Sequence, residues 1–526
     1  MRLSIGKVLE HFVDPTILRK RGRLLIYLSG GFLGLLLDCN QLAAQPEFPK
    51  PPILNVSTDL EQLPLGYHAN NILPNSPSQD SAPLLNDAIR WVSHYNTDNP
   101  STPYTQIIAL TGNYYFLTTR PLGGRQVDVI VRPENKNDQL QNVTIDLGGS
   151  SLFFANALYG AFNMTDCTGL VLSNFSIDYK TLPFTQLVVQ RILNSNQIVA
   201  VPGPTVPPED PYVDVYQLAQ SQIGAGLYGF DFRAGRLNPS TGRWIIEPLT
   251  KPGNTLTLKQ GAANLIEPGD TFEVEARGGG PAIWIQSCSS IQLQRLSIYS
   301  SGGVGIITNY SPDVSIQNVK IIPRPETSRL VSTNAGGIAV NQTGGNNTIQ
   351  NCRISGTQDD CISGNSAALN CVLVQPNIYL VVPGTTVYFV GPLTVAPVTD
   401  PASREPIVCT PRQAVTSGAR KNAKLTVTMM SPMPRLPAQA MMYSTDPATR
   451  GNGLTIDSND ISSNTLARGI ALSGQTGVTI RNNRLAWIQE AGIICGTNYA
   501  GNPKHRGSYS TFGPLSNIKI QNNHLH

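Results

Sequence analysis

Charged residues are scarce in this sequence: Asp, Glu, Lys and Arg make up only 14% of its 526 residues. The formal net charge is +4, and the repeated region described below contains no concentrated basic stripe, so nucleic acid is not an expected partner. The low charge accompanies 47 glycines and 40 prolines. This composition favours a turn-rich β protein over a helical one.

Cysteine and histidine are scarce too, with 8 and 6 residues. The sequence has no CxxC pair, and 7 cysteines remain after residue 44. An odd number without close pairs argues against a disulfide framework and against a zinc site. We therefore expect no bound metal and no cofactor.

The apolar run from Leu24 to Leu37 is 14 residues long, whereas a membrane-spanning helix needs about 20. Basic residues precede the run, and Leu42-Ala43-Ala44 follows it. This order is typical of a secretory signal peptide cleaved after Ala44. We expect a secreted, periplasmic or surface protein with no transmembrane span after cleavage. An uncleaved anchor is the alternative.

What the sequence does contain is an eight-residue repeat, apolar-x-apolar-x-x-(apolar or Asn)-x-apolar, which occurs eight times between Val143 and Leu525. The copies begin at Val143, Leu170, Ile291, Val314, Asn347, Leu454, Val478 and Ile518. Such a repeat is typical of a solenoid whose coils each supply short strands to parallel sheets. It predicts an all-β fold, a right-handed parallel β-helix. Coils stack about 4.8 Å apart, so equivalent residues of neighbouring coils lie side by side.

The sixth repeat position is apolar or Cys in the earlier copies and becomes Asn459, Asn483 and Asn523 in the last three. Asparagines at one coil position predict a stacked amide ladder, in which each side-chain NH₂ donates to the next carbonyl. The alternative is that each Asn is an ordinary turn residue.

The segments outside the repeat define the remaining organisation. After the signal peptide, residues 1–44, a Pro- and Asn-rich segment over 45–79 is expected to form an exposed lead-in. Helical spacing of apolar residues from Ser81, a suitable N-cap, to Tyr95 predicts a helix that covers the N-terminal end of the solenoid.

Two stretches, 181–278 and 367–450, lack the repeat and contain short alternating runs of apolar and polar residues. We expect each to form a small inserted β-domain. The cap and first coils then occupy 80–180, the central coils 279–366 and the last coils 451–526. A bare sheet end after the last coil would require a covering partner or a further segment.

Each coil has a second segment roughly six residues after its first strand. Aligned with one another, these segments give one column of residues: Gly302, Gly336, Asp359, Arg468 and Ala491. Because the second insertion loops out between two coils, Asp359 and Arg468 are expected on adjacent coils, about 5 Å apart. Asp360 lies beside them, and Glu490 flanks the row.

Paired carboxylates next to an arginine suit glycoside hydrolysis, because one acid can protonate the leaving oxygen while the other activates water. The like charge raises the pKa of one Asp, while Arg468 holds the other ionised. Adjacent strand residues point to opposite sides, so both aspartates face outward only where the chain bends. The alternative is a structural corner, in which Asp359 caps backbone amides and Asp360 pairs with Arg468.

Two further residues are candidates for substrate contacts. Asp178 directly precedes the first insertion, and it either faces the same cleft or merely terminates its strand. His505 lies in a long loop beside Lys504 and Arg506, where it either reaches the rim of the cleft or is solvated.

The segment from Asn351 to Ile362, with the run Asp359-Asp360-Cys361-Ile362, resembles the pectin-lyase-like superfamily, in particular polygalacturonase-type hydrolases. The chain is more similar still to β-helix glycoside hydrolases of the α-1,3-galactosidase type. Four segments carry that resemblance: Asn174–Gln186, Ala282–Cys288, Pro323–Pro325 and Ala467–Ile470. It extends over most of the chain after Asp80, and it implies a β-helix fold and glycoside hydrolysis.

Only Asp359, Asp360 and Arg468 match the family pattern by position. That pattern has a further Asp, often followed by His, one coil earlier, where this sequence has Gly336 and Ala339. The Gly-His-Gly element of polygalacturonases is also absent.

The leading hypothesis is a secreted β-helix glycosidase that acts on a polysaccharide or a terminal glycan. Asp359 and Asp360 would be catalytic, and the substrate-binding residues would be Arg468, Asp178, Glu490 and His505. A second hypothesis is a non-catalytic carbohydrate-binding surface protein that has lost the Asp at Gly336. A third is a polysaccharide lyase.

Overall fold

The structure is a computed structural model of the 526-residue chain. It describes residues 23–24, 37–38, 53–63, 70–122, 125–133, 138, 140–202, 227–238, 244–246, 255–258, 263–276, 278–341, 343–375, 378–381, 393–397, 407–409, 425–428, 439–444, 451–465, 467–496, 510–511 and 515–526. The chain divides into two units, Met1–Pro51 and Pro52–His526. In the first unit, β1 (Arg23–Leu24) pairs with β2 (Leu37–Asp38). The rest of the expected signal peptide lies outside the described residues.

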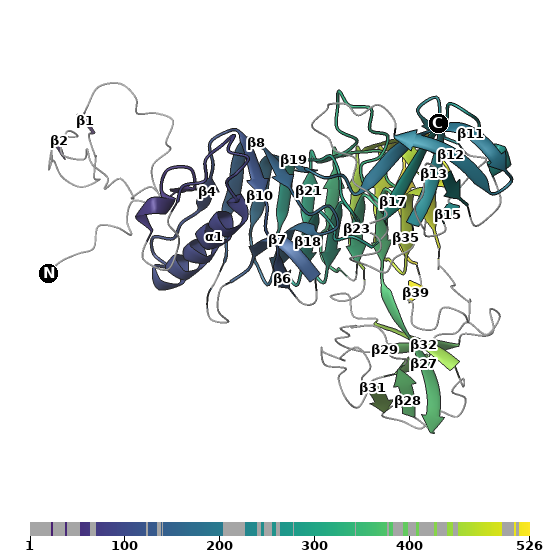
Figure 1. The fold of residues 1–526 in the computed structure, drawn as a ribbon. Coiled ribbons are helices and arrows are strands. Elements are labelled where there is room, and N and C mark those ends of the chain that lie inside the picture. Colours follow the sequence, from purple (N-terminus) through teal and green to yellow (C-terminus); the bar gives the residue numbers. More distant parts are fainter. Residues whose placement is uncertain are drawn as a thin grey trace. The chain divides into compact units, whose positions relative to one another are not determined.

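The larger of two long sheets runs through every coil of the second unit (Figure 1). Its 16 strands are β3 (Ile53–Asn55), β4 (Gln106–Ile108), β5 (Asn113–Phe116), β8 (Thr144–Phe154), β10 (Val171–Tyr179), β19 (Gln292–Ile298), β21 (Ser315–Gln317), β22 (Lys320–Ile321), β24 (Thr348–Gln350), β25 (Arg353–Ile354), β33 (Thr455–Asp457), β34 (Asp460–Thr465), β36 (Thr479–Arg481), β37 (Arg484–Ile488), β40 (Lys519–Gln521) and β41 (His524–Leu525).

All eight predicted copies of the repeat are confirmed as parallel neighbours in this sheet. The residue after the start of each copy pairs with its equivalent in the next coil, in the order Thr144, Val171, Gln292, Ser315, Thr348, Thr455, Thr479 and Lys519. The apolar residues of the pattern are therefore stacked along the solenoid axis, one coil above another.

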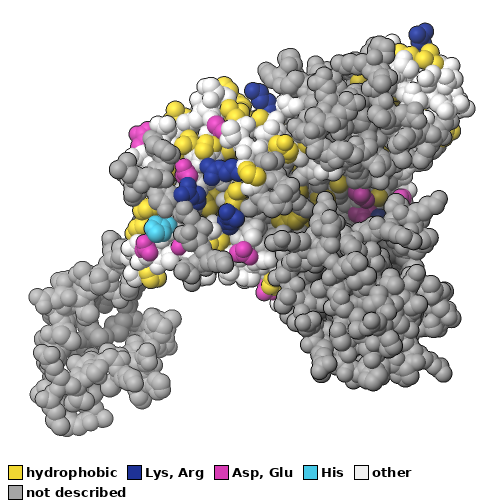
Figure 2. Space-filling model, turned by 60° about the horizontal axis from the view of Figure 1, so that its bottom comes forward, with side chains coloured by type: hydrophobic (Ala, Val, Ile, Leu, Met, Phe, Trp, Pro, Cys, Tyr) yellow, Lys and Arg dark blue, Asp and Glu magenta, His cyan; other side chains and the backbone are white. Residues whose placement is uncertain are grey.

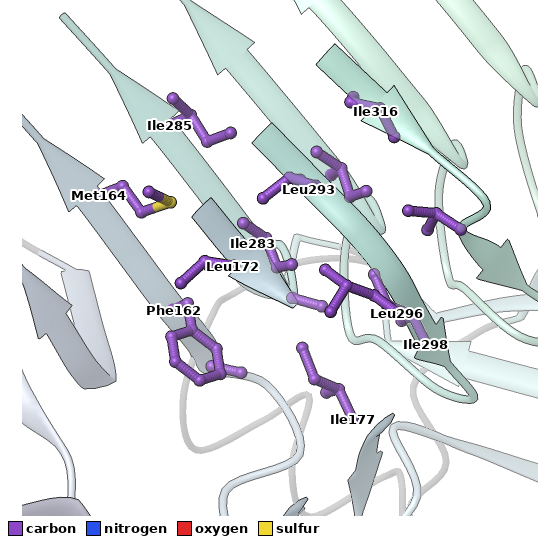
Figure 3. Packing of buried hydrophobic residues seen from close by; sticks show 14 of the residues in the cluster. Phe162, Met164, Leu172, Ile177, Ile283, Ile285, Leu293, Leu296, Ile298 and Ile316 are labelled. Carbon is purple, nitrogen blue, oxygen red and sulfur yellow. The ribbon is translucent and has the colours of Figure 1, made fainter. Parts of the chain in front are cut away.

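A second sheet of nine strands forms the facing wall of the coils. Its strands are β6 (Arg120–Leu122), β7 (Arg125–Val131), β9 (Gly160–Thr165), β18 (Ile283–Gln286), β20 (Ile306–Asn309), β23 (Ile338–Asn341), β26 (Ile362–Asn365), β35 (Arg468–Ser473) and β38 (Ala491–Cys495). Figure 3 shows Phe162 and Ile283 from this wall facing Leu172 and Leu296 from the larger sheet. All four are nearly or completely buried in one continuous core, where close packing and burial of apolar area stabilise the coils.

The predicted asparagine ladder is present at the sixth repeat position. The side-chain NH₂ of Asn459 donates to Asn483 Oδ1 at 2.9 Å, and that of Asn483 donates to Asn523 Oδ1 at 2.9 Å. Asn483 Oδ1 also accepts the backbone N–H of Asn459 at 2.9 Å. Because Asn483 is completely buried, the ladder satisfies polar groups that water cannot reach.

The predicted N-terminal helix is confirmed as α1 (Ser81–Asp98), and its apolar side chains join the core of the coils. Its N-cap is Asp80 rather than Ser81, because the Asp80 carboxylate accepts the N–H of Ala82. Among its described residues, the lead-in is only partly exposed, which differs from the prediction. Within it, β3 pairs with β4 and buries Leu54, and a 3₁₀ turn, η3 (Leu60–Gln62), follows.

Antiparallel sheets lie within both expected insertions. The first sheet, with the 3₁₀ turn η4 (Ala263–Leu265), contains β11 (Phe184–Asn194), β12 (Gln197–Pro202), β13 (Leu227–Arg233), β14 (Arg236–Leu237), β15 (Trp244–Ile246), β16 (Thr255–Thr257) and β17 (Thr271–Ala276). The second contains β27 (Ala367–Gln375), β28 (Ile378–Val381), β29 (Leu393–Pro397), β30 (Ile407–Cys409), β31 (Leu425–Thr428), β32 (Gln439–Ser444) and β39 (Ser510–Thr511). The segment 451–526 is therefore not made of coils alone, since β39 pairs with β27.

No helix among the described residues is long and apolar enough to cross a membrane. On the face of the molecule drawn in Figure 2, basic and acidic side chains are intermixed among apolar and neutral ones.

The ladder predicts a strong dependence of stability on Asn483. Asn483→Ala removes an acceptor and leaves the buried N–H of Asn459 without that partner, so we expect the free energy of unfolding to fall by about 3 kcal/mol. Gln521→Ala, an exposed position of the same last coil, serves as the control and should cost less than about 0.5 kcal/mol. Urea denaturation measures both. A loss for Asn483→Ala no larger than that of the control would contradict the ladder as the source of stability.

Candidate functional site

Asp359 and Asp360 lie at the corner that leads into β26. In the second sheet Ile338, Ile362 and Ile470 are register partners, which aligns Asp360 with Arg468 and with Gly336. The backbone N–H of Cys361 accordingly donates to the carbonyl of Arg468 at 2.9 Å. The predicted register, which aligned Asp359 with Arg468 and Gly336, is therefore wrong by one residue.

The same pairing corrects the other end of the predicted column, because Ile306 is the partner of Ile338. Val304 rather than Gly302 thus aligns with Gly336. At the C-terminal end of the column Arg468 pairs with Ala491, as predicted. Glu490, one residue before Ala491, therefore aligns with Asp359.

The centre of the site is a short ion pair. Arg468 Nε donates to Asp360 Oδ1 at 2.7 Å, and the backbone N–H of Arg468 donates to the same oxygen at 3.3 Å. Glu490 Oε2 lies 3.7 Å from Arg468 Nε on the other side. Asp360, Arg468 and Glu490 form a row of charges. The Asp360 side chain is 15% exposed and that of Glu490 is 60% exposed, so the row begins at a partly buried acid and ends at a solvent-exposed carboxylate.

Asp359 makes a different kind of contact. Its Oδ1 accepts the backbone N–H of Asp360 at 3.0 Å, and its own carbonyl accepts the hydroxyl of Thr357 at 2.9 Å. The bond from Asp359 to a backbone amide and the pairing of Asp360 with Arg468 are the contacts expected for the alternative interpretation, in which this corner is structural. The bend turns both aspartates away from full burial, and both remain partly accessible.

The electrostatics of Asp360 are unusual for a carboxyl group. Its pKa is raised to about 6: burial is the largest cause, the nearby Asp359 carboxylate adds to it, and Arg468 opposes both. At a pH close to 6 the group is divided between its protonated and ionised forms. It can therefore give up or take a proton near neutrality, which an exposed aspartate does poorly.

The segment 251–389 matches the family model for the right handed beta helix region. The chain folds as a right-handed parallel β-helix.

Curated relatives of this β-helix protein include α-1,3-galactosidases. It is 27% identical to α-1,3-galactosidase A of Bacteroides thetaiotaomicron over 251 residues, which cover 44% of this chain and 42% of the relative. It is 24% identical to α-1,3-galactosidase B of the same organism over 275 residues, covering 48% of this chain and 42% of the relative. The chain thus spans about two fifths of the length of the curated relatives it matches.

Solved structures with a similar fold are more distant. The A-module of a mannuronan C-5 epimerase from Azotobacter vinelandii is 7% identical, with a TM-score of 0.31 over 84% of this chain and 72% of that chain. A tailspike protein of an E. coli bacteriophage, in complex with a pentasaccharide, is 11% identical, with a TM-score of 0.32 over 95% of this chain and 48% of that chain. Similarity this low carries nothing about shared chemistry.

In the β-helix, Gly336 is packed directly against the backbone of Asp360. A Cβ atom at this position would lie 2.8 Å from the backbone carbonyl oxygen of Asp360. A side chain there would displace the corner that carries the carboxyl group. Where the family pattern has its additional Asp, this chain has a glycine, and the absence of a side chain lets the backbones of two coils approach closely.

Asp178 does not join this row. Its side chain is only 3% exposed, and Arg329 Nη1 lies 2.9 Å from its Oδ1 while Arg324 Nη1 lies 3.0 Å from its Oδ2. The hydroxyl of Ser300 also donates to it at 2.6 Å. A buried carboxylate held by two guanidinium groups anchors the loop before β23, so a direct contact with substrate is not supported.

Sequence reasoning missed Arg324 and Arg329 as the partners of Asp178. The segment Pro323–Pro325 contributed to the family resemblance, but nothing in the spacing indicated an ion pair. His505 lies outside the described residues, so its predicted place at the cleft rim stays a prediction. Among the residues that the structure describes, no group of three or more His, Cys, Asp or Glu side chains is arranged to hold a metal ion.

The raised pKa of Asp360 predicts a pH-dependent stability. Its pKa of about 6 in the fold exceeds the ordinary value of 3.8, so the folded state binds the proton more tightly. The stabilisation is complete below the ordinary value and is lost as pH rises through about 6. Relative to Asp360→Asn, the wild-type free energy of unfolding should therefore decline over this window and then level off.

Urea denaturation of both proteins across this pH range measures the difference. Arg468→Met removes the cation that lowers the pKa, so the decline should extend to higher pH, whereas Arg484→Met, an exposed arginine paired with Asp460, should leave it unchanged. A constant offset between wild type and Asp360→Asn at every pH would contradict a raised pKa.

Proposed function

We propose that this chain is a secreted glycoside hydrolase that acts on a polysaccharide or on the terminal sugar of a glycan. The observation that carries the proposal is the partly buried Asp360, paired with Arg468 at 2.7 Å, with a pKa raised to about 6 beside a second carboxylate. Such a group can hold a proton at the pH where a leaving glycosidic oxygen needs one.

In this proposal Asp360 is the general acid that protonates the leaving glycosidic oxygen, and Asp359 is the carboxylate that takes a proton from the water attacking the sugar carbon. Protonation of Asp360 weakens its pairing with Arg468, and the guanidinium is then available to a substrate oxygen. After the bond breaks, the ionised Asp360 is stabilised again by Arg468. The open Glu490 is placed to accept hydrogen bonds from sugar hydroxyls at the outer end of the row.

The sequence relatives support a glycosidase over the other hypotheses. Those described above are named α-1,3-galactosidases, which makes a terminal α-1,3-linked galactose the first substrate to test. The signal-peptide pattern at residues 1–44 agrees with an extracellular glycan as substrate, and N-terminal sequencing of the protein secreted by its host would test cleavage after Ala44.

The test is turnover of a panel of oligosaccharides, including one that ends in α-1,3-linked galactose. Asp360→Asn should lower kcat/KM by about 10² to 10⁴ because the amide cannot donate the proton. Asp460→Asn, an exposed carboxylate of a neighbouring strand, is the matched control and should match the wild type. Undiminished turnover by Asp360→Asn would remove this residue from the mechanism.

The pH profile provides an independent check. The general acid must be protonated, so kcat/KM should fall as pH rises above about 6. In Arg468→Met this fall should move to higher pH, since the cation that favours ionisation is gone. A profile that does not respond to Arg468→Met would contradict the assignment of this limb to Asp360.

A non-catalytic carbohydrate-binding protein is the second candidate. It is favoured by the bond from the Asp360 N–H to Asp359, which occupies the second carboxylate, and by the lack of a third acid at Gly336. This function predicts saturable binding of a glycan with no product formed.

A further inference from the structure

Trp487 is a large, exposed aromatic side chain in the same coil as Glu490, whose carboxylate lies 3.7 Å from Arg468 Nε. It lies in β37, three residues before Glu490, and it is 60% exposed. Buried aromatic rings stabilise a core, whereas a largely exposed tryptophan contributes less to folding. An exposed aromatic ring in the coil that carries Glu490 is available to contact a ligand.

The backbone at Trp487 is in an unusual conformation. Its φ is 59°, in the left-handed region that bulky residues rarely occupy. The strain coincides with a β-bulge, because β34 and β37 are in register at Ser462 and Ala486 and resume at Thr465 and Ile488. Bulges re-aim a side chain, and strain of this kind is concentrated at functional sites. Here the extra residue of the bulge lies in β34 opposite Trp487, whose indole is exposed just before the corner that leads to Glu490.

A second element holds the indole ring in place. The guanidinium carbon of Arg236, in β14, lies 4.1 Å from the centre of the Trp487 ring, a cation–π contact. Arg236 follows the tight turn at Ala234 and Gly235, and the hairpin packs against β34.

The hairpin itself is rigidly anchored. Arg233, the partner of Arg236 across the turn, donates to Asp270 through Nε at 3.2 Å and through Nη2 at 3.0 Å, and its Nη1 lies 2.9 Å from Glu267. These ion pairs hold the end of β13, with which the strand of Arg236 is paired. The first insertion thus supplies Arg236, which packs on the ring of Trp487, a residue of the coils.

We infer that Trp487 is a stacking platform on which a sugar ring of the substrate lies while it approaches Asp360. This inference rests on the proposed function and adds a binding residue to that same site. A pyranose has a face rich in C–H groups, which packs on an aromatic ring, and hydroxyls at its edge, which bond to carboxylates and guanidinium groups. Trp487 supplies the aromatic surface. Glu490, three residues later, and Arg468, on the preceding coil, supply the hydrogen-bonding groups.

The platform is tested by binding, separately from turnover. In the Asp360→Asn background, which prevents turnover of the ligand, titration calorimetry with a disaccharide ending in α-1,3-linked galactose and with the rest of the panel gives Kd. Trp487→Ala should weaken binding by about ten-fold or more, and Trp487→Phe, which keeps an aromatic face, should restore most of it. Trp284→Phe, a half-buried tryptophan of β18, is the matched control and should bind as its parent.

Fluorescence gives a second measurement. The exposed indole should change its emission when the sugar is added, and this change should disappear in Trp487→Phe but not in Trp284→Phe. Unaltered Kd in Trp487→Ala would overturn the inference, as would an absence of binding to every member of the panel. Trp487-dependent binding without hydrolysis by the wild type would instead sustain the inference and refute the proposed hydrolase.

Discussion

The vertical pairing of strands between coils is the constraint on which the whole molecule depends. A coil contributes strands as short as two residues, such as β22 and β25, and these hold no structure alone. Each persists because backbone hydrogen bonds and stacked apolar side chains continue from one coil to the next. The asparagine ladder extends the same arrangement to a polar position in the interior. A local error of one residue would expose the core side chains and bury the outward ones.

The candidate site inherits this constraint. Asp360 and Arg468 come from different coils, and they meet because the pairing of Ile362 with Ile470 sets their height along the axis. Three effects then act on one carboxyl group: burial and Asp359 favour its protonated form, and Arg468 favours its ionised form. Burial and Asp359 outweigh Arg468, so the pKa of Asp360 rises to about 6 and the group can donate a proton near neutrality. The same contacts therefore stabilise the corner and set the pKa of the carboxyl group at the candidate site.

Most of the coil architecture was predictable from the sequence because burial on one face of a strand imposes a two-residue period. The copies at Leu170 and Ile291 follow that period closely, and they pair as predicted. The corner was harder. Cys361 and Ile362 are both completely buried, so alternation no longer identifies which of them faces the core strand, and the predicted register slipped by one. The ion pairs of Asp178 were not predictable at all, since they join residues 146 and 151 positions apart through the conformation of a long loop.

The separation of Asp360 and Arg468 along the chain has a consequence for how the molecule is made. The two residues are 108 positions apart, although they occupy successive coils. Bringing such distant positions together carries a larger entropic cost than closing a coil of ordinary length, and contacts of this kind slow folding. The coils on either side can pair locally during synthesis, whereas this junction has to wait for the second insertion to emerge. The charged row is thus expected among the last parts of the solenoid to assemble, and a protein arrested before that step would have most of its coils but no site.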